Sequence, residues 1–254
     1  MSSPRIAAVT GASSGIGRAI AVAIGGLGWS VALGARRTAL LTETADLVHA
    51  AGGSPFPHVL DVTDPGSVDA FFAAVEDAIG PVDALINNAG IAVPGMLVDT
   101  DPADLAREVG TNLLGPLFCA RRVLPTMLAA THGDIVLISS DAATTPRPGL
   151  IGYSASKAAL ETVARVLDME TEGTGIRTTV VRVGPTITDF AGAWTPGTFE
   201  NLVELWPRFG IQRHFNTLNP HDIATAVVHA LTAPDHARIA VIELQPVAPT
   251  STAE

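Results

Sequence analysis

Tyr153 and Lys157 are the residues of this sequence best suited to acid–base chemistry. Each is the only residue of its type among 254, and the two are four positions apart. Residues at this spacing lie on the same face of a helix. Because an ammonium group beside a phenol favours the phenolate, we expect Lys157 to lower the pKa of Tyr153 from about 10 towards the working range of a general acid–base catalyst.

A glycine-rich segment near the N-terminus has the composition of a phosphate-binding loop. Residues 10–17 connect the first predicted strand to a predicted helix. Glycines allow a close backbone approach to a pyrophosphate, whose charge is stabilised by the free N–H groups of the helix N-terminus. A turn without a ligand is the alternative, which the strand–turn–helix context disfavours. The cofactor contacts expected here are Gly11, Ser13, Ser14, Gly15, Ile16 and Gly17.

The end of the second predicted strand indicates which dinucleotide is bound. Arg36 and Arg37 occupy the position at which a carboxylate would bind the ribose diol of NAD. A guanidinium group pairs well with a phosphate dianion, so the arginines favour NADP(H), without excluding NAD(H). The alternative is that both are solvated residues at the start of the next helix.

Strand-like and helix-like segments alternate along the chain and would position these residues. Predicted strands cover residues 6–10, 30–33, 56–60, 84–86, 134–138, 177–183 and 238–242, and predicted helices 16–27, 38–51, 67–78, 105–130, 153–171 and 221–232. Apolar runs such as residues 134–138 suit strands buried on both faces. The alternation predicts a single-domain, doubly wound (Rossmann-like) α/β fold over residues 1–254, with a parallel sheet and helices on both faces.

One segment, residues 190–219, interrupts this alternation and is rich in Phe and Trp. Long insertions in compact domains are often lids or binding loops. We therefore expect a substrate lid over an apolar pocket, with Phe190 and Trp194 among its substrate contacts. The alternative is an ordinary helix packed on the sheet, and a helical flap over the pocket would combine the two.

Composition narrows the class of protein and of partner. Hydrophobic residues make up 47% of the chain and charged residues 16%, which excludes a disordered chain. The formal net charge of −10 argues against nucleic-acid binding, which needs a basic surface. The single cysteine, Cys119, cannot form an internal disulfide and is expected to be buried, and the sequence contains no metal-site spacing.

The sequence predicts neither a membrane span nor a targeting signal. The longest uncharged run, residues 19–35, is shorter than the ~20 residues that span a bilayer, and glycines interrupt it. The N-terminal residues lack the cleavage site of a secretory leader. We expect a soluble, cytoplasmic protein that acts on a small molecule.

Taken in order, these motifs resemble those of the short-chain dehydrogenases/reductases, in the branch of about this length. The matching segments are residues 10–17, 61–62, 87–90, 112, 138–140, 153–157 and 184–188, so the resemblance covers nearly the whole chain. It implies an NADP(H)-dependent oxidoreductase that transfers hydride between the nicotinamide and a carbonyl/alcohol substrate. It also implies a homodimer or homotetramer, because the helices predicted at 105–130 and 153–171 resemble those that form family oligomers.

The resemblance implies a catalytic set of Asn112, Ser140, Tyr153 and Lys157. Ser140 would hydrogen-bond the substrate oxygen, and Tyr153 would exchange a proton with it. Both are placed as donors because that oxygen gains negative charge as hydride arrives. Lys157 would hold the nicotinamide ribose, and Asn112 would support a water relay to Lys157. The implied cofactor contacts are Asp61 and Val62 at the adenine, Asn88, Ala89 and Gly90 beside the cofactor, Tyr153 and Lys157, and Gly184, Thr186 and Thr188 at the carboxamide.

Three positions depart from the family pattern. Ser14 stands where NADP-binding members often have a basic residue, which leaves Arg36 and Arg37 to bind the phosphate. Gly184 is followed by proline, where members often have Pro-Gly. Asp141 follows Ser140 at a position commonly apolar or small, and it could contact a polar or cationic substrate group or be a solvated or capping carboxylate.

Two other functions are compatible with the fold. A non-catalytic dinucleotide sensor or scaffold is one, since a fold does not imply activity. The single tyrosine and lysine at residues 153 and 157 disfavour it. A nucleotide-sugar epimerase or dehydratase is the other. Those relatives resemble longer chains with an additional C-terminal substrate domain, for which the stretch after Thr188 is too short.

Overall fold

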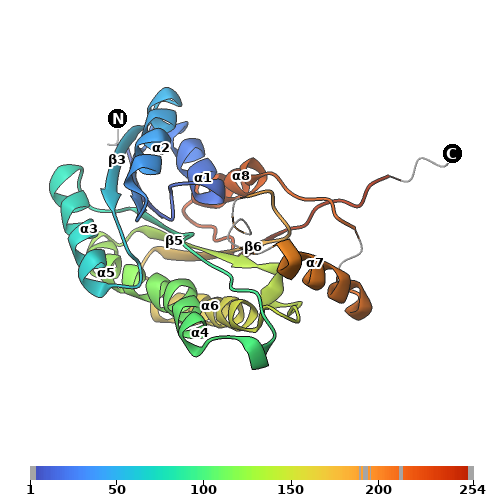
Figure 1. The fold of residues 1–254 in the computed structure, drawn as a ribbon. Coiled ribbons are helices and arrows are strands. Elements are labelled where there is room, and N and C mark those ends of the chain that lie inside the picture. The colour runs from blue at the N-terminus through green and yellow to red at the C-terminus, as the bar shows by residue number, and fades with distance from the viewer. Residues whose placement is uncertain (1–3, 189, 191–193, 195, 212–213, 251–254) are drawn as a thin grey trace.

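A computed structural model describes residues 4–188, 190, 194, 196–211 and 214–250 (Figure 1). Seven parallel strands form one sheet in the order β3-β2-β1-β4-β5-β6-β7. Their bounds are β1 (Ile6–Thr10), β2 (Ser30–Ala35), β3 (Ser54–Val59), β4 (Ala84–Asn87), β5 (Gly133–Ser140), β6 (Ile176–Val183) and β7 (Val241–Leu244). The helices are α1 (Gly15–Gly25), α2 (Thr38–Ala50), α3 (Pro65–Ala78), α4 (Pro102–Val109), α5 (Gly115–Ala130), α6 (Ile151–Glu170), α7 (Pro196–Leu205) and α8 (Pro220–Leu231).

Helices cover both faces of the sheet, and the strand residues alternate between them. In β1, Ala7 and Val9 belong to one apolar cluster, and Ile6 and Ala8 to a second. Helices α1, α2 and α8 contribute to the first cluster and α3, α5 and α6 to the second (Figure 1). Successive side chains of a strand point to opposite faces, so central strands need apolar residues at every position. The predicted doubly wound α/β fold is confirmed.

The seven predicted strands are all present, with small differences in their limits. The first has the predicted limits, Ile6–Thr10, whereas the strand predicted at 238–242 forms at Val241–Leu244. Cys119 is buried, as expected, and burial raises the pKa of its thiol to about 12. The largest difference among the predicted helices concerns residues 105–130.

The helix predicted at residues 105–130 is divided by a π-helical turn. Helix α4 ends at Val109, the π turn covers Gly110–Leu114, and α5 begins at Gly115. Pro116, in the first turn of α5, has no N–H and cannot donate to the carbonyl four residues earlier. The wider turn shifts the helix face by one residue exactly where Asn112 lies, and such turns often occur at functional sites.

The joined helix Pro102–Ala130 is long and apolar enough, by length and composition alone, to cross a membrane. Core helices of folded domains pass the same test. Here the α5 part contributes Cys119, Val123 and Met127 to the second apolar cluster. These contacts with the sheet are those of a core helix.

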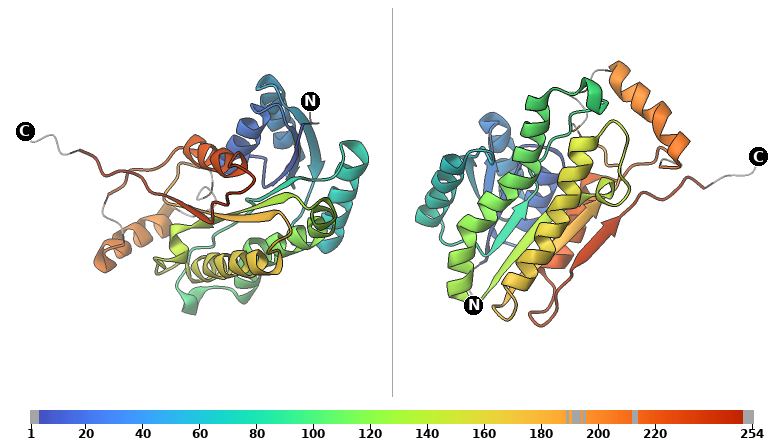
Figure 2. Two further views of the ribbon diagram at one scale, coloured as in Figure 1. Left: turned by 180° about the vertical axis from the view of Figure 1, so that it is seen from behind. Right: turned by 90° about the horizontal axis from the view of Figure 1, so that it is seen from below.

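Residues of the segment expected to form a lid lie outside the two layers that cover the sheet. Helix α7 is followed by a 3₁₀ turn, Trp206–Phe209. Leu202 and Trp206 pack with Leu150 in a third apolar cluster, at the start of α6. Figure 2 shows α7, in orange, apart from the helices on the sheet faces. The alternative of an ordinary helix packed on the sheet is therefore wrong for α7.

Candidate active site

The strand order reverses between β1 and β4, and the glycine-rich loop lies at this point. Strand β1 has β2 on one side and β4 on the other, so the crossovers leave in opposite directions there. In open α/β sheets, ligands bind outside the carboxyl ends of the strands at such a switch point. Most of the residues predicted to contact cofactor follow these carboxyl ends.

Gly11 and Gly17 lack side chains because neighbouring atoms fill the space. Gly11 has φ +66°, and a Cβ there would lie 2.9 Å from Ala89 Cα. A Cβ on Gly17 would overlap Asn88 Nδ2 and the carbonyl of Gly11. The loop is thus packed directly on the segment after β4, and Gly15, with φ +55°, starts α1.

Asn88 and Ala89 fasten the end of β4 to the end of β1. Their backbone N–H groups both donate to Thr10 Oγ1 at 3.0 Å, and Asn88 Nδ2 donates to the Thr10 carbonyl at 2.9 Å. These bonds fix the two strand ends whose loops would hold a cofactor. The predicted grouping of Asn88 and Ala89 with the glycine-rich loop is what the structure contains.

Arg37 reaches back to the glycine-rich loop, which offsets the uncharged residue at position 14. Its Nη2 donates to Ser13 Oγ at 3.0 Å and to Ser14 Oγ at 2.6 Å. Arg36 instead extends from the end of β2, with its side chain 70% exposed and 4.0 Å from Asp61 Oδ2. Arg37 is therefore anchored on the loop, and Arg36 is exposed at the end of β2 beside Asp61.

Asp61 and Val62 follow β3 and line the same edge. Burial raises the pKa of Asp61, but hydrogen bonds from Thr63 and the charge of Arg36 outweigh it, so the pKa is lowered. Val62 is buried, and a Cβ on Gly115 would lie 2.8 Å from its Cγ2. The contact joins this edge to the start of α5.

Lys157 is buried between α6 and the sheet. Its Nζ donates to the Ile138 carbonyl at 2.7 Å and lies 5.8 Å from the ring centroid of Tyr153. A Cβ on Gly90 would lie 3.5 Å from Nζ, so the ammonium group is next to the segment after β4. Burial lowers the pKa of Lys157 to about 8.

Burial raises the pKa of Tyr153 to about 12, so the expectation that Lys157 lowers it is wrong. The hydrogen bond with Ser140 opposes this rise, and the carboxylates of Asp141 and Glu108 add to it. The spacing of Tyr153 and Lys157 indicates a neighbouring cation but not the desolvation of the phenol, which is the larger effect on a buried group. The phenol is thus held in its protonated form at neutral pH.

Ser140 ends β5 beside the phenol. Its Oγ accepts the Ala142 N–H at 3.2 Å and donates to Asp141 Oδ1 at 3.1 Å. It also forms the hydrogen bond that affects the pKa of Tyr153. The hydroxyl group is therefore oriented by three groups, two of which belong to its own turn.

Asp141 is neither solvated nor free to meet a substrate cation. Arg147 donates to its two oxygens at 2.8 and 2.6 Å, and the two side chains are 12% and 11% exposed. The expectation of a solvated or capping carboxylate is wrong because a bidentate arginine neutralises this group. A direct substrate contact is also unsupported, since both oxygens are occupied.

Asn112 lies in the π turn and holds the loop that follows β4. Its Oδ1 accepts the Ile91 N–H at 2.9 Å, and its Nδ2 donates to the Ile91 carbonyl at 2.8 Å and to Ser156 Oγ at 3.1 Å. Ser156 lies one residue before Lys157 on α6. The side chain thus links the loop to α6.

The segment after β6 closes the far side of the site. Gly184 donates its N–H to the Leu244 carbonyl, and Thr186 Oγ1 donates to the Gly184 carbonyl at 2.9 Å. Thr188 lies against the glycine-rich loop, where a Cβ on Gly15 would come within 3.3 Å of its Cγ2. Thr188 is therefore beside the loop, and Gly184 and Thr186 lie between it and β7 in the chain's path after β6. Their contact with the carboxamide stays a prediction.

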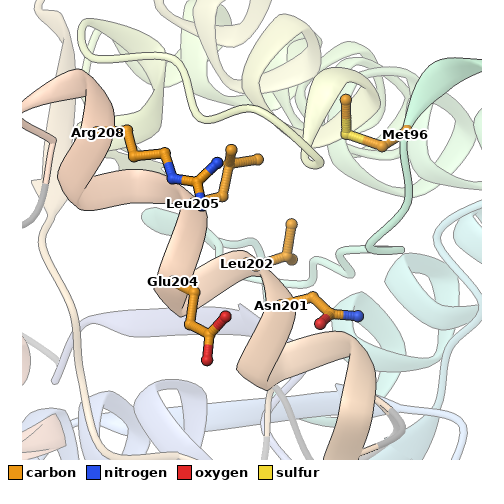
Figure 3. Close-up of a pocket in the computed structure, with 6 residues that line it drawn as sticks. All are labelled: Met96, Asn201, Leu202, Glu204, Leu205 and Arg208. Carbon is orange, nitrogen blue, oxygen red and sulfur yellow. The ribbon is translucent and has the colours of Figure 1, made fainter.

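Aromatic and apolar side chains pack beside Tyr153. The ring of Phe190 lies 5.6 Å from that of Tyr153, and Trp194 Nε1 donates to the Ala92 carbonyl at 3.0 Å. A small pocket of about 190 Å³ lies further out, between Met96 and the α7 segment (Figure 3). Its other lining residues are Asn201, Leu202, Glu204, Leu205 and Arg208.

Sequence reasoning missed Glu108, Arg147 and Trp206. Glu108 is 1% exposed although it lies in a helix that carries exposed charges. Trp206 Nε1 donates to the Pro148 carbonyl at 2.9 Å, and Arg147 lies 5.6 Å from the Trp206 ring. The groups that Glu108, Arg147 and Trp206 contact are distant in sequence or are common residue types. The only sequence signal for any of the three was the aromatic content of residues 190–219, which includes Trp206.

The comparisons with known proteins agree with this geometry. A family model described as short chain dehydrogenase matches residues 5–198. The chain is 37% identical over 244 residues to a glycine betaine reductase of Emericella nidulans. The matched region is 96% of this chain but only 19% of that protein. It is 41% identical over 177 residues to a short chain dehydrogenase of Pseudocercospora fijiensis, spanning 56% of its length. It is 31% identical to an uncharacterized oxidoreductase of Staphylococcus aureus, over 96% of this chain and 97% of the relative.

Solved structures of the same fold carry related cofactors. An alcohol dehydrogenase from the archaeon Thermococcus sibiricus, complexed with 5-hydroxy-NADP, superposes with a TM-score of 0.82 at 28% identity, covering 96% of this chain and 97% of that one. A serine dehydrogenase complexed with NADP+ gives a TM-score of 0.85 at 27% identity, covering 98% of both chains. Together with the match over residues 5–198, these likenesses establish that the chain belongs to the short-chain dehydrogenase family and is an oxidoreductase of that family.

Proposed function

We propose that this oxidoreductase transfers hydride between NADP(H) and a carbonyl/alcohol pair, with Tyr153 as general acid/base. The observation that carries the proposal is the convergence of Tyr153, Ser140 and Lys157, with Lys157 Nζ 5.8 Å from the phenol ring. They lie near the segment after β4, which also packs on the glycine-rich loop. Carbonyl reduction requires hydrogen-bond donors to the substrate oxygen, here the Tyr153 and Ser140 hydroxyl groups, and a cation beside them, here the Lys157 ammonium group.

The residues fit a dinucleotide that carries a 2′-phosphate. The N-terminus of α1 follows the glycine-rich loop and offers free N–H groups to a pyrophosphate. Arg37 is anchored on the loop, and the exposed Arg36 at the end of β2 is suited to a phosphate dianion. The alcohol and serine dehydrogenases named above are complexed with NADP forms, which supports the same cofactor class here. When bound, it supplies the hydride.

The chain's own groups then handle the proton. As the carbonyl carbon gains hydride, the oxygen takes the Tyr153 proton, and the Ser140 hydroxyl stabilises the developing charge. The phenolate regains a proton from water. The raised pKa of Tyr153, about 12, keeps the phenol protonated at neutral pH, so that it can donate to the oxygen. Lys157, whose Nζ donates to the Ile138 carbonyl, would hold the nicotinamide ribose. Asn112 holds the loop after β4 through Ile91.

We also propose that residues 190–219 form a lid for an apolar substrate. Leu202, Trp206 and Trp194 pack beside Tyr153 and Leu150, and Phe190 faces the phenol ring. The relatives are named for different substrates (glycine betaine, an alcohol and serine), so they support the oxidoreductase class rather than one substrate.

A homo-oligomer and a cytoplasmic location complete the proposal. An apolar groove of about 330 Å³ lies between α5 and α6, lined by residues that include Leu117, Leu124, Leu128 and Leu167. Exposed apolar surface of this kind favours association of copies. The buried single cysteine, Cys119, suits a reducing compartment. Light scattering on the purified protein measures the assembly, and a monomer at all concentrations contradicts the oligomer.

The decisive experiment for the reaction compares the wild type with Tyr153→Phe. The wild type is expected to oxidise NADPH in the presence of apolar ketones or aldehydes, and Tyr153→Phe to lose turnover while it still binds NADPH in calorimetric titration. Turnover retained by Tyr153→Phe contradicts the acid–base role. A wild type that binds NADPH but reduces no member of a broad carbonyl panel favours the non-catalytic sensor.

A further inference from the structure

Glu108 is a buried carboxyl group beside the helix that carries Tyr153. It is the only buried residue of α4 among those described, and 1% of it is exposed. Its Oε1 accepts the Val93 N–H at 2.8 Å. Its Oε2 is buried as well and has no hydrogen-bond partner within the described part of the chain. Burying a carboxyl group has a cost that a surface position avoids, so this placement needs a reason.

The unpartnered oxygen faces the first turn of α6. A Cβ built on Gly152 would overlap Glu108 Oε2, and it would lie 3.2 Å from Leu105 Cδ2. Gly152 therefore makes room for the carboxyl group directly before Tyr153 in the chain. The acid and the phenol are close enough that the charge of Glu108 raises the pKa of Tyr153.

Glu108 and Asn112 act on the same loop. They are four residues apart, on either side of the start of the π turn. Asn112 binds both backbone polar groups of Ile91, and Glu108 binds the N–H of Val93. At the loop's far end, Gly95 donates to the Gly149 carbonyl at 2.9 Å. The loop that faces Tyr153 is thus held at three points, and α4 supplies one of them through Glu108.

We propose that Glu108 is a positioning residue for this reaction: it clamps the loop after β4 at Val93 and fits the space left by Gly152, so that the loop and the Tyr153 phenol keep a fixed relation. The proposal rests on the proposed function of Tyr153. The clamp itself is a property of the loop and can be measured without turnover.

The charge of Glu108 gives a second, independent readout. Burial raises its pKa, the Val93 hydrogen bond lowers it, Asp104 on the same helix raises it and Arg107 lowers it, with a net rise. From α6, the facing titratable group is Tyr153. Ionised Glu108 makes the phenolate less stable. Replacing it by a neutral isostere should therefore move the pH limb that reports Tyr153 to lower pH.

The kinetic test compares Glu108→Ala and Glu108→Gln. Glu108→Ala removes the clamp and is expected to lower kcat about 10- to 100-fold, because small misplacements near reacting groups have effects of this size. Its affinity for NADPH, measured by calorimetry, should stay unchanged. Glu108→Gln keeps an acceptor for Val93 and should recover most of the lost kcat, with the Tyr153 limb displaced to lower pH.

Asp104→Asn is the matched control, since it removes one negative charge from the same helix at a partly exposed position. It is expected to keep the wild-type kcat. Glu108→Ala with a kcat within about twofold of the wild type, or Glu108→Gln with an unmoved limb and no rescue, overturns the proposal.

Hydrogen exchange separates failure of the clamp from failure of the proposed function. Amide groups of residues 91–95 should exchange faster in Glu108→Ala than in the wild type, and at the wild-type rate in Glu108→Gln. Faster exchange in Glu108→Ala supports the clamp even if no carbonyl substrate is found. Unchanged protection of this loop, in a variant that melts like the wild type, overturns the clamp.

Discussion

The guanidinium group of Arg147 holds both oxygens of the Asp141 carboxylate, at 2.8 and 2.6 Å, directly beside Ser140. Both side chains are nearly buried, at 11% and 12% exposure. Such a pair adds little stability relative to apolar residues, yet removal of one partner leaves a buried charge. The pair therefore neutralises a carboxylate that orients Ser140 and lies in the electrostatic surroundings of Tyr153.

Arg147→Met is expected to destabilise the fold by about 3 kcal/mol, because Asp141 then remains buried and uncompensated. Arg107→Met is the matched control: Arg107 also pairs with an aspartate, Asp104, but its side chain is 58% exposed. Exposed pairs contribute about 0–1 kcal/mol. Urea unfolding of both variants measures the difference, and equal losses of stability contradict a buried pair at Asp141.

Lys157 should reduce stability at neutral pH. Its pKa is about 8 in the fold, below the ordinary 10.5, because burial disfavours the ammonium form. Between these values the unfolded chain binds one proton more than the fold, so this residue's destabilising effect is complete below about pH 8 and is relieved as the pH rises to 10.5. The sign is opposite to that of a lysine that gains a partner.

Lys157→Met is therefore expected to be inactive yet more stable than the wild type at pH 7, by about 1–3 kcal/mol after the lost bond to Ile138 is subtracted. The gain should shrink towards alkaline pH. Arg165→Met, an exposed change on the same helix, controls for loss of charge. Unfolding curves at several pH values test this, and a less stable Lys157→Met at pH 7 contradicts it.

Arg36 is expected to determine the choice of cofactor. Its side chain is 70% exposed beside the loop, whereas Arg37 is anchored on Ser13 and Ser14. A charge-assisted bond to the 2′-phosphate contributes about 1.5–3 kcal/mol, so Arg36→Ala should weaken NADPH binding roughly 10- to 100-fold and leave NADH binding nearly unchanged. Calorimetric titrations with each dinucleotide measure this. Tighter binding of NADH than of NADPH by the wild type contradicts the assignment.

The parts of this protein that sequence predicts well are those with a local signal. Strand β1 has its predicted limits because both of its faces are buried, and a run of apolar residues indicates such a strand directly. The glycine-rich loop, and the spacing of Tyr153 and Lys157, follow from backbone space and helix periodicity.

The parts that sequence predicts poorly depend on tertiary contacts. The pKa of Tyr153 rises because the fold buries the phenol, which four-residue spacing does not reveal. Asp141 pairs with Arg147, six residues on, and Arg147 also lies 5.6 Å from the Trp206 ring, which is distant in sequence. In the sequence, Glu108 resembles the exposed charged residues of an amphipathic helix. Its burial becomes apparent only from the structure, where it packs against Gly152.

Trp206 should affect substrate binding if the α7 segment is a lid. Its ring packs with Leu150 and Leu202 near Tyr153, and its Nε1 donates to the Pro148 carbonyl at 2.9 Å. Trp206→Ala removes a large apolar surface from the wall of the site, so KM for an apolar carbonyl should rise about 10-fold or more. The affinity for NADPH should stay the same, because the Trp206 ring packs on Leu150 and Leu202 rather than on the glycine-rich loop.

Phe209→Ala is the matched control for Trp206→Ala, since Phe209 belongs to the same 3₁₀ turn but is 61% exposed. It should leave both KM and the melting temperature close to those of the wild type. Steady-state kinetics over a series of ketones with longer apolar chains gives the sharper comparison, because the loss in Trp206→Ala should grow with chain length. If Trp206→Ala lowers only the melting temperature and leaves every KM unchanged, the segment is a structural cluster and the lid assignment is wrong.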